Sequence, residues 1–199
     1  KTEAAVSLGE LPVWKGVQDA PGFHRLPFGL CLERGVIRFN AAAVDVQPIV
    51  DRYGSDSFTF STTPPGLSEW GNRLGDWYLR ELAGAAGDLS GKTVLEIGAG
   101  TLYVGRRVVR ELRAARFIAC DPALRADGEM PSQVEAVRAY FDAAMFRDRA
   151  IDLVVSINNL EHIPDPFEYL RHVRALLERT RGRAFIVIPE CSRAFRTGD

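Results

Sequence analysis

Five short runs in the second half of the chain predict buried β-strands: residues 94–97, 117–121, 134–137, 151–157 and 184–189. Three segments with apolar residues at spacings of three and four predict amphipathic helices: residues 67–83, 104–112 and 166–177. Strands that alternate with helices are typical of an α/β fold. We therefore expect a doubly wound, mostly parallel sheet in this half of the chain.

The N-terminal part has weaker patterns. Residues 28–32 and 36–39 indicate two short strands around a glycine-containing turn, which predicts a hairpin. Residues 1 to about 19 are loosely patterned, and we expect only partial order there. Prolines and a glycine between residues 19 and 27, including Pro27, predict turns.

The length of 199 residues and the hydrophobic content of 46% fit a soluble chain with one domain and a small module. We place the module at residues 1–65 and the domain at residues 66–199. The net charge of −1 gives no electrostatic case for nucleic-acid binding. No apolar run is long enough for a membrane span, and no secretory signal begins the sequence. Three widely spaced cysteines fit free thiols in a reducing compartment, so we expect a cytoplasmic protein.

The turn after the first strand of the domain carries candidate binding chemistry. Gly98 and Gly100 lack a Cβ, so a ligand can approach the backbone closely. A dinucleotide site requires a small residue at the third glycine position, where Tyr103 is expected to obstruct packing of the helix on the strand. S-adenosylmethionine is another common ligand of such a turn, and Glu96 offers an acid to its cationic amino group.

Two later segments extend this pattern. Asp121 ends the second predicted strand, where an acid at this spacing can accept hydrogen bonds from two ribose hydroxyls. The run IDLVVSINNLEHIPDP occupies residues 151–166. With the Glu-x-Gly-x-Gly turn, these segments resemble the class I S-adenosylmethionine-dependent methyltransferases over residues 93–189, which implies a Rossmann-like sheet. We take ten residues as the cofactor-binding set: Glu96, Gly98, Ala99, Gly100, Asp121, Pro122, Phe141, Asp142, Asn158 and Asn159.

The roles of three further side chains rest on this resemblance. The loop after the fourth strand faces the transferred methyl group in the family, and His162 is its one imidazole, a candidate general base. The alternative is a structural histidine satisfied by local backbone. Asp142 is a candidate contact of the adenine amino group, with a helix cap as the alternative. Some relatives use the acid at the position of Glu161 to help hold a divalent metal; for this chain we predict no metal.

The N-terminal part resembles the small zinc-binding domain of some deoxysugar C-methyltransferases. Cys31 stands at the first cysteine of their Cys-x-x-Cys-Gly knuckle, but Arg34 replaces the second. A structural zinc needs about four Cys or His ligands, and only His24 is another candidate nearby, so we predict no zinc. Phe58 and Phe60 stand where tyrosines are expected.

The resemblances imply S-adenosylmethionine-dependent methyl transfer to a small molecule, with a nucleotide-linked sugar ahead of a quinone or phenol. Two alternatives stay open: a nicotinamide-dependent oxidoreductase, and a non-catalytic module that binds S-adenosylmethionine without turnover. The last two strands of the resembled fold have no counterpart in the sequence. We therefore expect a C-terminally incomplete domain whose fifth strand is an unpaired edge.

Overall fold

The structure is a computed structural model that describes residues 2–13, 24–33, 36–39, 69–124 and 129–189. The chain divides into two compact units, residues 1–59 and residues 60–199. In the part of the chain that the structure describes, no helix has both the length and the apolar character needed to cross a membrane.

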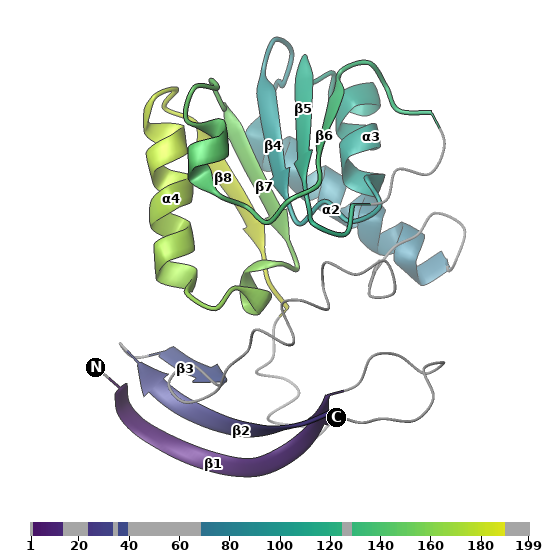
Figure 1. Ribbon diagram of the computed structural model, residues 1–199. Helices are drawn as coiled ribbons and strands as arrows, with labels where there is room; N and C mark the ends of the chain where they lie inside the picture. Colours follow the sequence, from purple (N-terminus) through teal and green to yellow (C-terminus); the bar gives the residue numbers. More distant parts are fainter. Residues whose placement is uncertain (1, 14–23, 34–35, 40–68, 125–128, 190–199) are drawn as a thin grey trace. The chain divides into compact units, whose positions relative to one another are not determined.

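The N-terminal unit contains an antiparallel sheet of three strands in chain order (Figure 1). They are β1 (Thr2–Val13), β2 (His24–Glu33) and β3 (Val36–Phe39). Glu33 of β2 pairs with Val36 of β3, so the predicted hairpin is confirmed.

The strand β1 was not predicted, and two irregularities in its pairing explain why. The register shifts between Thr2 and Ala4 and again between Ser7 and Gly9. Each shift interrupts the alternation by which a strand is recognised. The predicted turn at Pro27 is wrong, because Pro27 lies within β2 and pairs with Glu10.

Among the described residues of the second unit, five parallel strands form one sheet in the order β6-β5-β4-β7-β8. The strands are β4 (Thr93–Ile97), β5 (Arg116–Cys120), β6 (Val134–Val137), β7 (Leu153–Ile157) and β8 (Arg183–Val187). All five predicted strands and the doubly wound α/β class are confirmed. The strand β7 starts later than predicted, and Asp152 before it accepts a hydrogen bond from the N–H of Thr93 (2.8 Å).

Helices cover both faces of this sheet (Figure 1). The longer helices are α2 (Glu69–Ala86), α3 (Tyr103–Glu111) and α4 (Pro166–Glu178), and the short 3₁₀ helices are η1 (Ala143–Phe146) and η2 (Leu160–His162). On the face of α2 and α3, Leu82 and Phe117 are fully buried in one core cluster. On the face of α4 and η1, Phe146 and Val154 are fully buried in another. The sheet is therefore packed on both sides, as its continuous apolar strands predict.

The start of α4 follows its sequence signals. The Oδ1 of Asp165 accepts a hydrogen bond from the N–H of Glu168 (2.9 Å). Pro166 occupies the first turn, where its missing N–H leaves no helical bond unmade. Both residues therefore fix the point at which the chain enters the helix.

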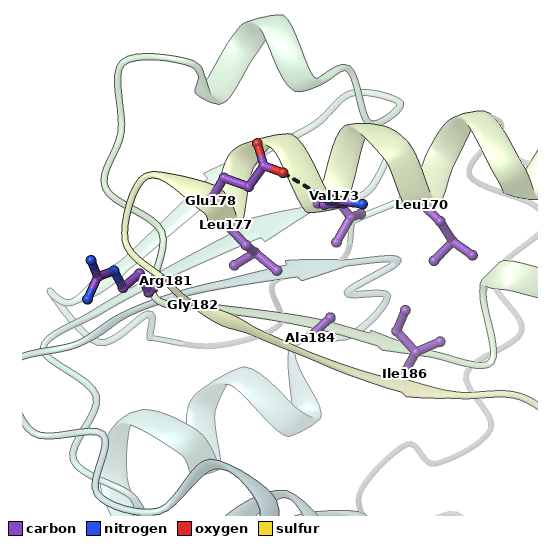
Figure 2. Close-up of a pocket in the computed structure, with 9 residues that line it drawn as sticks. Leu170, Val173, Leu177, Glu178, Arg181, Gly182, Ala184 and Ile186 are labelled. Atoms are coloured by element: carbon purple, nitrogen blue, oxygen red, sulfur yellow. Dashed lines mark hydrogen bonds and ion pairs between the residues drawn. The ribbon is translucent and has the colours of Figure 1, made fainter.

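An apolar groove runs beside β8 (Figure 2). Among the described residues, the one strand neighbour of β8 is β7. The groove has a volume of about 470 Å³, and apolar side chains of α4 and β8 face one another across it: Leu170, Val173, Leu177, Ala184 and Ile186. It contains no residue of the predicted binding site.

Candidate functional site

The turn after β4 lies at the switch point of the sheet. The neighbours of β4 are β5 on one side and β7 on the other, and ligands of such folds bind at this point beyond the carboxyl ends of the strands. Gly98 has a φ of 82° and Gly100 a φ of 50°, a backbone region that glycine enters readily. A Cβ at Gly100 would meet no atom within 4 Å, so the backbone there is open to a ligand.

Leu102 closes this turn in an unusual conformation. Its φ is 63°, and it directly precedes α3. A left-handed backbone costs a leucine about 1–2 kcal/mol, whereas burying its side chain stabilises by about 1.5–3 kcal/mol. Leu102 is fully buried, and its N–H donates to the carbonyl of Ala99 (2.9 Å). Core packing therefore sets the shape of the turn, which the sequence pattern did not indicate.

Tyr103 does not obstruct the packing of helix on strand, so that argument against a dinucleotide site is wrong. Its ring lies against α2, where a Cβ at Gly75 would collide with it. The close approach between α3 and β5 is made by Gly105, where a Cβ would collide with Phe117. A glycine inside a helical pattern is the sequence signal of such an approach.

Asp121 links two neighbouring turns. Its Oδ2 accepts a hydrogen bond from the N–H of Gly100 (2.9 Å), and its Oδ1 accepts one from the N–H of Ala123 (2.7 Å). A carboxylate has about four acceptor positions, so each oxygen can accept a further bond from a ligand hydroxyl. The ribose-binding role of Asp121 and the cofactor contact of the neighbouring Pro122 stay predictions. The hydrogen bonds by which Asp121 joins the turns after β4 and β5 are present in the structure.

Glu96 is a buried acid at the end of β4, with 3% of its surface exposed. Its Oε2 has no hydrogen-bond partner among the described residues. Burial raises the pKa of Glu96 well above its ordinary value of 4.5, and the nearby carboxylate of Asp121 raises it further. A buried unpaired oxygen costs about 1–3 kcal/mol. A cationic or N–H-bearing ligand group would remove that cost.

Asn158 begins the loop after β7 with a φ of 48°. Its backbone N–H donates to the carbonyl of Val187 (2.9 Å). Its Nδ2 donates to the hydroxyl of Tyr78 (3.0 Å), a buried residue of α2 that lies 80 positions earlier in the chain. Tyr78 was not predicted as a site residue, because no local sequence pattern connects residues so far apart.

Asn159 is held on the other face of the sheet. Its Nδ2 donates to the Oγ of Ser156 (3.2 Å), which also accepts a bond from the hydroxyl of Tyr169 on α4 (3.1 Å). A Cβ at Gly98 would lie 2.8 Å from the Cγ of Asn159. The loops after β4 and β7 are therefore in contact, and only a glycine fits between them.

Phe141 and Asp142 follow β6. The ring of Phe141 stacks with Phe146, with centroids 6.0 Å apart, and meets Tyr169 edge-on at 5.4 Å. The Oδ1 of Asp142 accepts a bond from the N–H of Ala144 (2.8 Å), so Asp142 caps η1. The capping alternative is thus present in the structure, while the adenine contact stays a prediction.

His162 lies at the end of η2, and its backbone N–H donates to the carbonyl of Asn159 (3.0 Å). Its side chain is 49% exposed, with Nε2 3.8 Å from Oε1 of Glu161. The general-base role stays a prediction. Within the ranges that the structure covers, no three His, Cys, Asp or Glu side chains gather where they could hold a metal ion.

The predicted residues fall into two groups. Direct contacts join Gly98 to Asn159 and Gly100 to Asp121, and Glu96 interacts electrostatically with Asp121. The positions of Asp142 and His162 are fixed by local backbone bonds instead. The structure therefore assembles the centre of the site around β4, β5 and β7.

Comparison with known proteins identifies the family of the domain. A model of the methyltransferase-domain family matches residues 68–196. The chain belongs to this methyltransferase family. The resemblance to class I S-adenosylmethionine-dependent methyltransferases is thereby confirmed for the domain, and all ten predicted cofactor residues lie inside the match.

This methyltransferase domain also has matches among solved structures. One is the [4+2]-cyclase SpnF, at 19% identity and a TM-score of 0.45, with 66% of this chain and 52% of that chain covered. The chain thus spans about half of the SpnF chain. No curated protein is significantly similar to this chain. These comparisons do not test the resemblance of the N-terminal unit to a zinc-binding domain.

Proposed function

We propose that this methyltransferase binds S-adenosylmethionine across the carboxyl ends of β4 and β5 and transfers its methyl group to a small-molecule acceptor. The observation that carries the proposal is the buried, unpartnered Oε2 of Glu96 beside the glycine turn. A buried polar atom without a partner favours a ligand that supplies a hydrogen bond or a positive charge. The amino group of S-adenosylmethionine supplies both.

The remaining cofactor contacts follow from the positions of the acids. Asp121 would accept hydrogen bonds from the ribose hydroxyls with acceptor positions that Gly100 and Ala123 leave open. Asp142 would accept a bond from the adenine amino group at Oδ2, because its Oδ1 already caps η1. Gly98 and Gly100 would let the cofactor lie close to the backbone.

Bound S-adenosylmethionine supplies a methyl group on a cationic sulfur, so the leaving group is already activated. The protein has to align the acceptor with that methyl group, and the loop of Asn158 and Asn159 borders the reacting position. For a weakly nucleophilic acceptor a base must also take a proton. We assign that proton transfer to the imidazole of His162, in the 3₁₀ helix that follows this loop.

The acceptor class rests on the N-terminal unit. Its resemblance to deoxysugar C-methyltransferases favours a nucleotide-linked sugar as the acceptor. O-methylation of a quinone or phenol is the second candidate, because a Glu-His pair like Glu161-His162 follows the same strand in such enzymes. A module that binds S-adenosylmethionine without turnover is the third.

Calorimetric titration of the full chain with S-adenosylhomocysteine, the demethylated product, tests the cofactor assignment. We expect binding at one site, and no binding of NADH in a matched titration. Binding of NADH but not of S-adenosylhomocysteine would contradict the proposal and favour an oxidoreductase. Binding without methylation of any sugar nucleotide, quinone or phenol would favour the non-catalytic alternative.

The His162→Ala variant tests the assignment of the base. We expect turnover to fall about 100-fold, the usual contribution of a general base, with the affinity for S-adenosylhomocysteine within a few-fold of wild type. The His172→Ala variant is the matched control, since His172 lies on the exposed side of α4. Equal turnover of wild type and His162→Ala would remove His162 from the mechanism.

A further inference from the structure

Two consecutive asparagines after β7 are tied to opposite faces of the sheet. Asn158 donates its amide N–H to Tyr78 of α2, and Asn159 donates its own to Ser156, which also accepts a bond from Tyr169 of α4. The loop that borders the glycine turn is thus fixed from both sides. Of these three bonds, the one between Asn158 and Tyr78 joins the residues that are farthest apart in sequence, 80 positions.

The Tyr78 contact fixes the orientation of an amide that would otherwise rotate. Asn158 has a left-handed backbone, φ 48°, whose position the bond from its N–H to the carbonyl of Val187 already holds. Its side chain has an N–H end and a carbonyl end. Because Nδ2 donates to the phenol oxygen of Tyr78 at 3.0 Å, Oδ1 must lie on the side away from Tyr78.

Burial makes this contact specific. Tyr78 is 5% exposed, and its ring packs against Trp77 with centroids 5.3 Å apart. A buried phenol oxygen is retained where it has a partner, since phenylalanine would otherwise fill the same space without a polar atom. The partner here is a residue of the candidate site, not a residue of the core.

We infer that Tyr78 is a positioning residue of the methyl-transfer site: it turns the amide of Asn158 so that Oδ1 is presented to the amino-acid end of the bound cofactor. The inference rests on the proposed function. The neighbouring Asn159 touches Gly98, and Gly98 follows Glu96 within the same turn. In this inference, Asn158 Oδ1 is a second acceptor for the hydrogen-bond-donating group that Glu96 Oε2 binds.

A double-mutant cycle on the full chain tests this inference with binding alone. The variants are Tyr78→Phe, which removes only the hydroxyl, Asn158→Gly, which keeps the left-handed backbone accessible, and the two combined. Calorimetry measures the dissociation constant of S-adenosylhomocysteine for each. We expect each single change to weaken binding about 3- to 10-fold, the usual range for one hydrogen bond. The double variant should bind no worse than the weaker single variant.

The Tyr103→Phe variant is the control. It also removes a partly buried tyrosine hydroxyl, but that hydroxyl accepts a hydrogen bond from Arg107, which lies outside the site. Its affinity should match wild type. The thermal midpoint of each variant verifies folding, and a purely structural Tyr78 would lower that midpoint without changing the affinity.

The outcomes distinguish a failure of the inference about Tyr78 from a failure of the proposed function. Wild-type affinity in Tyr78→Phe, or losses that add in the double variant, would overturn the inference while leaving the proposed function intact. Failure of the wild-type chain to bind S-adenosylhomocysteine would overturn both. If Tyr78→Phe does not fold, the same amide is tested from the loop side by Asn158→Gly, and unchanged affinity there overturns the inference as well.

Discussion

The ends of β4 and β5 each carry one acid, and the two carboxylates have opposite surroundings. Asp121 accepts backbone hydrogen bonds at both oxygens, from Gly100 and Ala123. Glu96 is buried with one oxygen that has no partner in the described part of the chain, and its pKa is raised by burial and by Asp121. The same side-chain chemistry thus stabilises the fold at one strand end and strains it at the other.

This difference indicates which acid the fold needs and which one it tolerates. Removing the carboxylate of Asp121 leaves two backbone N–H groups without their acceptor, which destabilises the protein. Removing the charge of Glu96 takes away an unfavourable buried group. An acid that costs stability is retained where a ligand uses it, so Glu96 identifies the binding side of the turn more directly than Asp121 does.

The largest expected effect comes from Asp121→Ala. The free energy of unfolding should fall by about 2–3 kcal/mol, because hydrogen bonds to a charged acceptor are lost at two N–H groups. Affinity for S-adenosylhomocysteine should fall by about 1–3 kcal/mol. Urea unfolding and calorimetry measure the two quantities. Asp121→Asn keeps one acceptor oxygen and should lose less in both, and an unchanged affinity in Asp121→Ala would place the ribose elsewhere.

Gly98→Ala should destabilise the protein by about 2 kcal/mol. The added Cβ would lie 2.8 Å from the Cγ of Asn159, and the alanine would have to adopt a φ of 82°. Steric overlap and backbone strain would therefore both destabilise the variant. Gly100→Ala is the matched control: its φ of 50° brings strain, but no atom lies within 4 Å of the new Cβ. A loss of about 1 kcal/mol is expected there. Equal losses in the two variants would mean that the contact between the loops is unimportant.

The smallest effect has the opposite sign. A pKa raised in the folded state means that the stability contribution of neutral Glu96 is complete below pH 4.5 and is lost as the pH rises toward the folded-state pKa. Glu96→Gln should therefore increase the free energy of unfolding at about pH 8, because the variant has no carboxylate to ionise in the buried site. Near pH 4 the gain should vanish.

Urea unfolding at both pH values measures this effect, and calorimetry should show weaker binding of S-adenosylhomocysteine by Glu96→Gln. The Glu135→Gln variant is a useful contrast. Burial raises the pKa of Glu135, but bonds from Arg149 and Arg116 outweigh it and the net pKa is lowered. Its stabilising contribution is present above the ordinary pKa and is lost in acid. A Glu96→Gln variant that is less stable than wild type at about pH 8 would contradict the conclusion that the buried carboxylate of Glu96 destabilises the fold.

The sequence predicted the parts of the fold that depend on local pattern. The five strands of the larger sheet are apolar runs, and Asp165 and Pro166 are local signals that mark the start of α4. The glycine turn was found for the same reason, since Gly98 and Gly100 directly follow a buried strand. The strand β1 was missed because its register shifts hide the alternation.

The supporting contacts of the site could not be predicted in this way. Tyr78 reaches Asn158 across 80 residues, and Tyr169 reaches Ser156 between a helix and a strand. Such pairs depend on how helices pack on the sheet, and a single sequence does not specify that. One signal was available: Ser156 is a polar residue in a buried apolar run, and such a residue needs a partner.

Leu102 has a consequence for how ligands are recognised. Its side chain anchors the glycine turn in the interior, so the turn holds its outline before anything binds. A compound designed against this outline meets a surface that is already formed, and little conformational freedom is lost on association. Rigid analogues should therefore gain more affinity here than flexible ones of equal size.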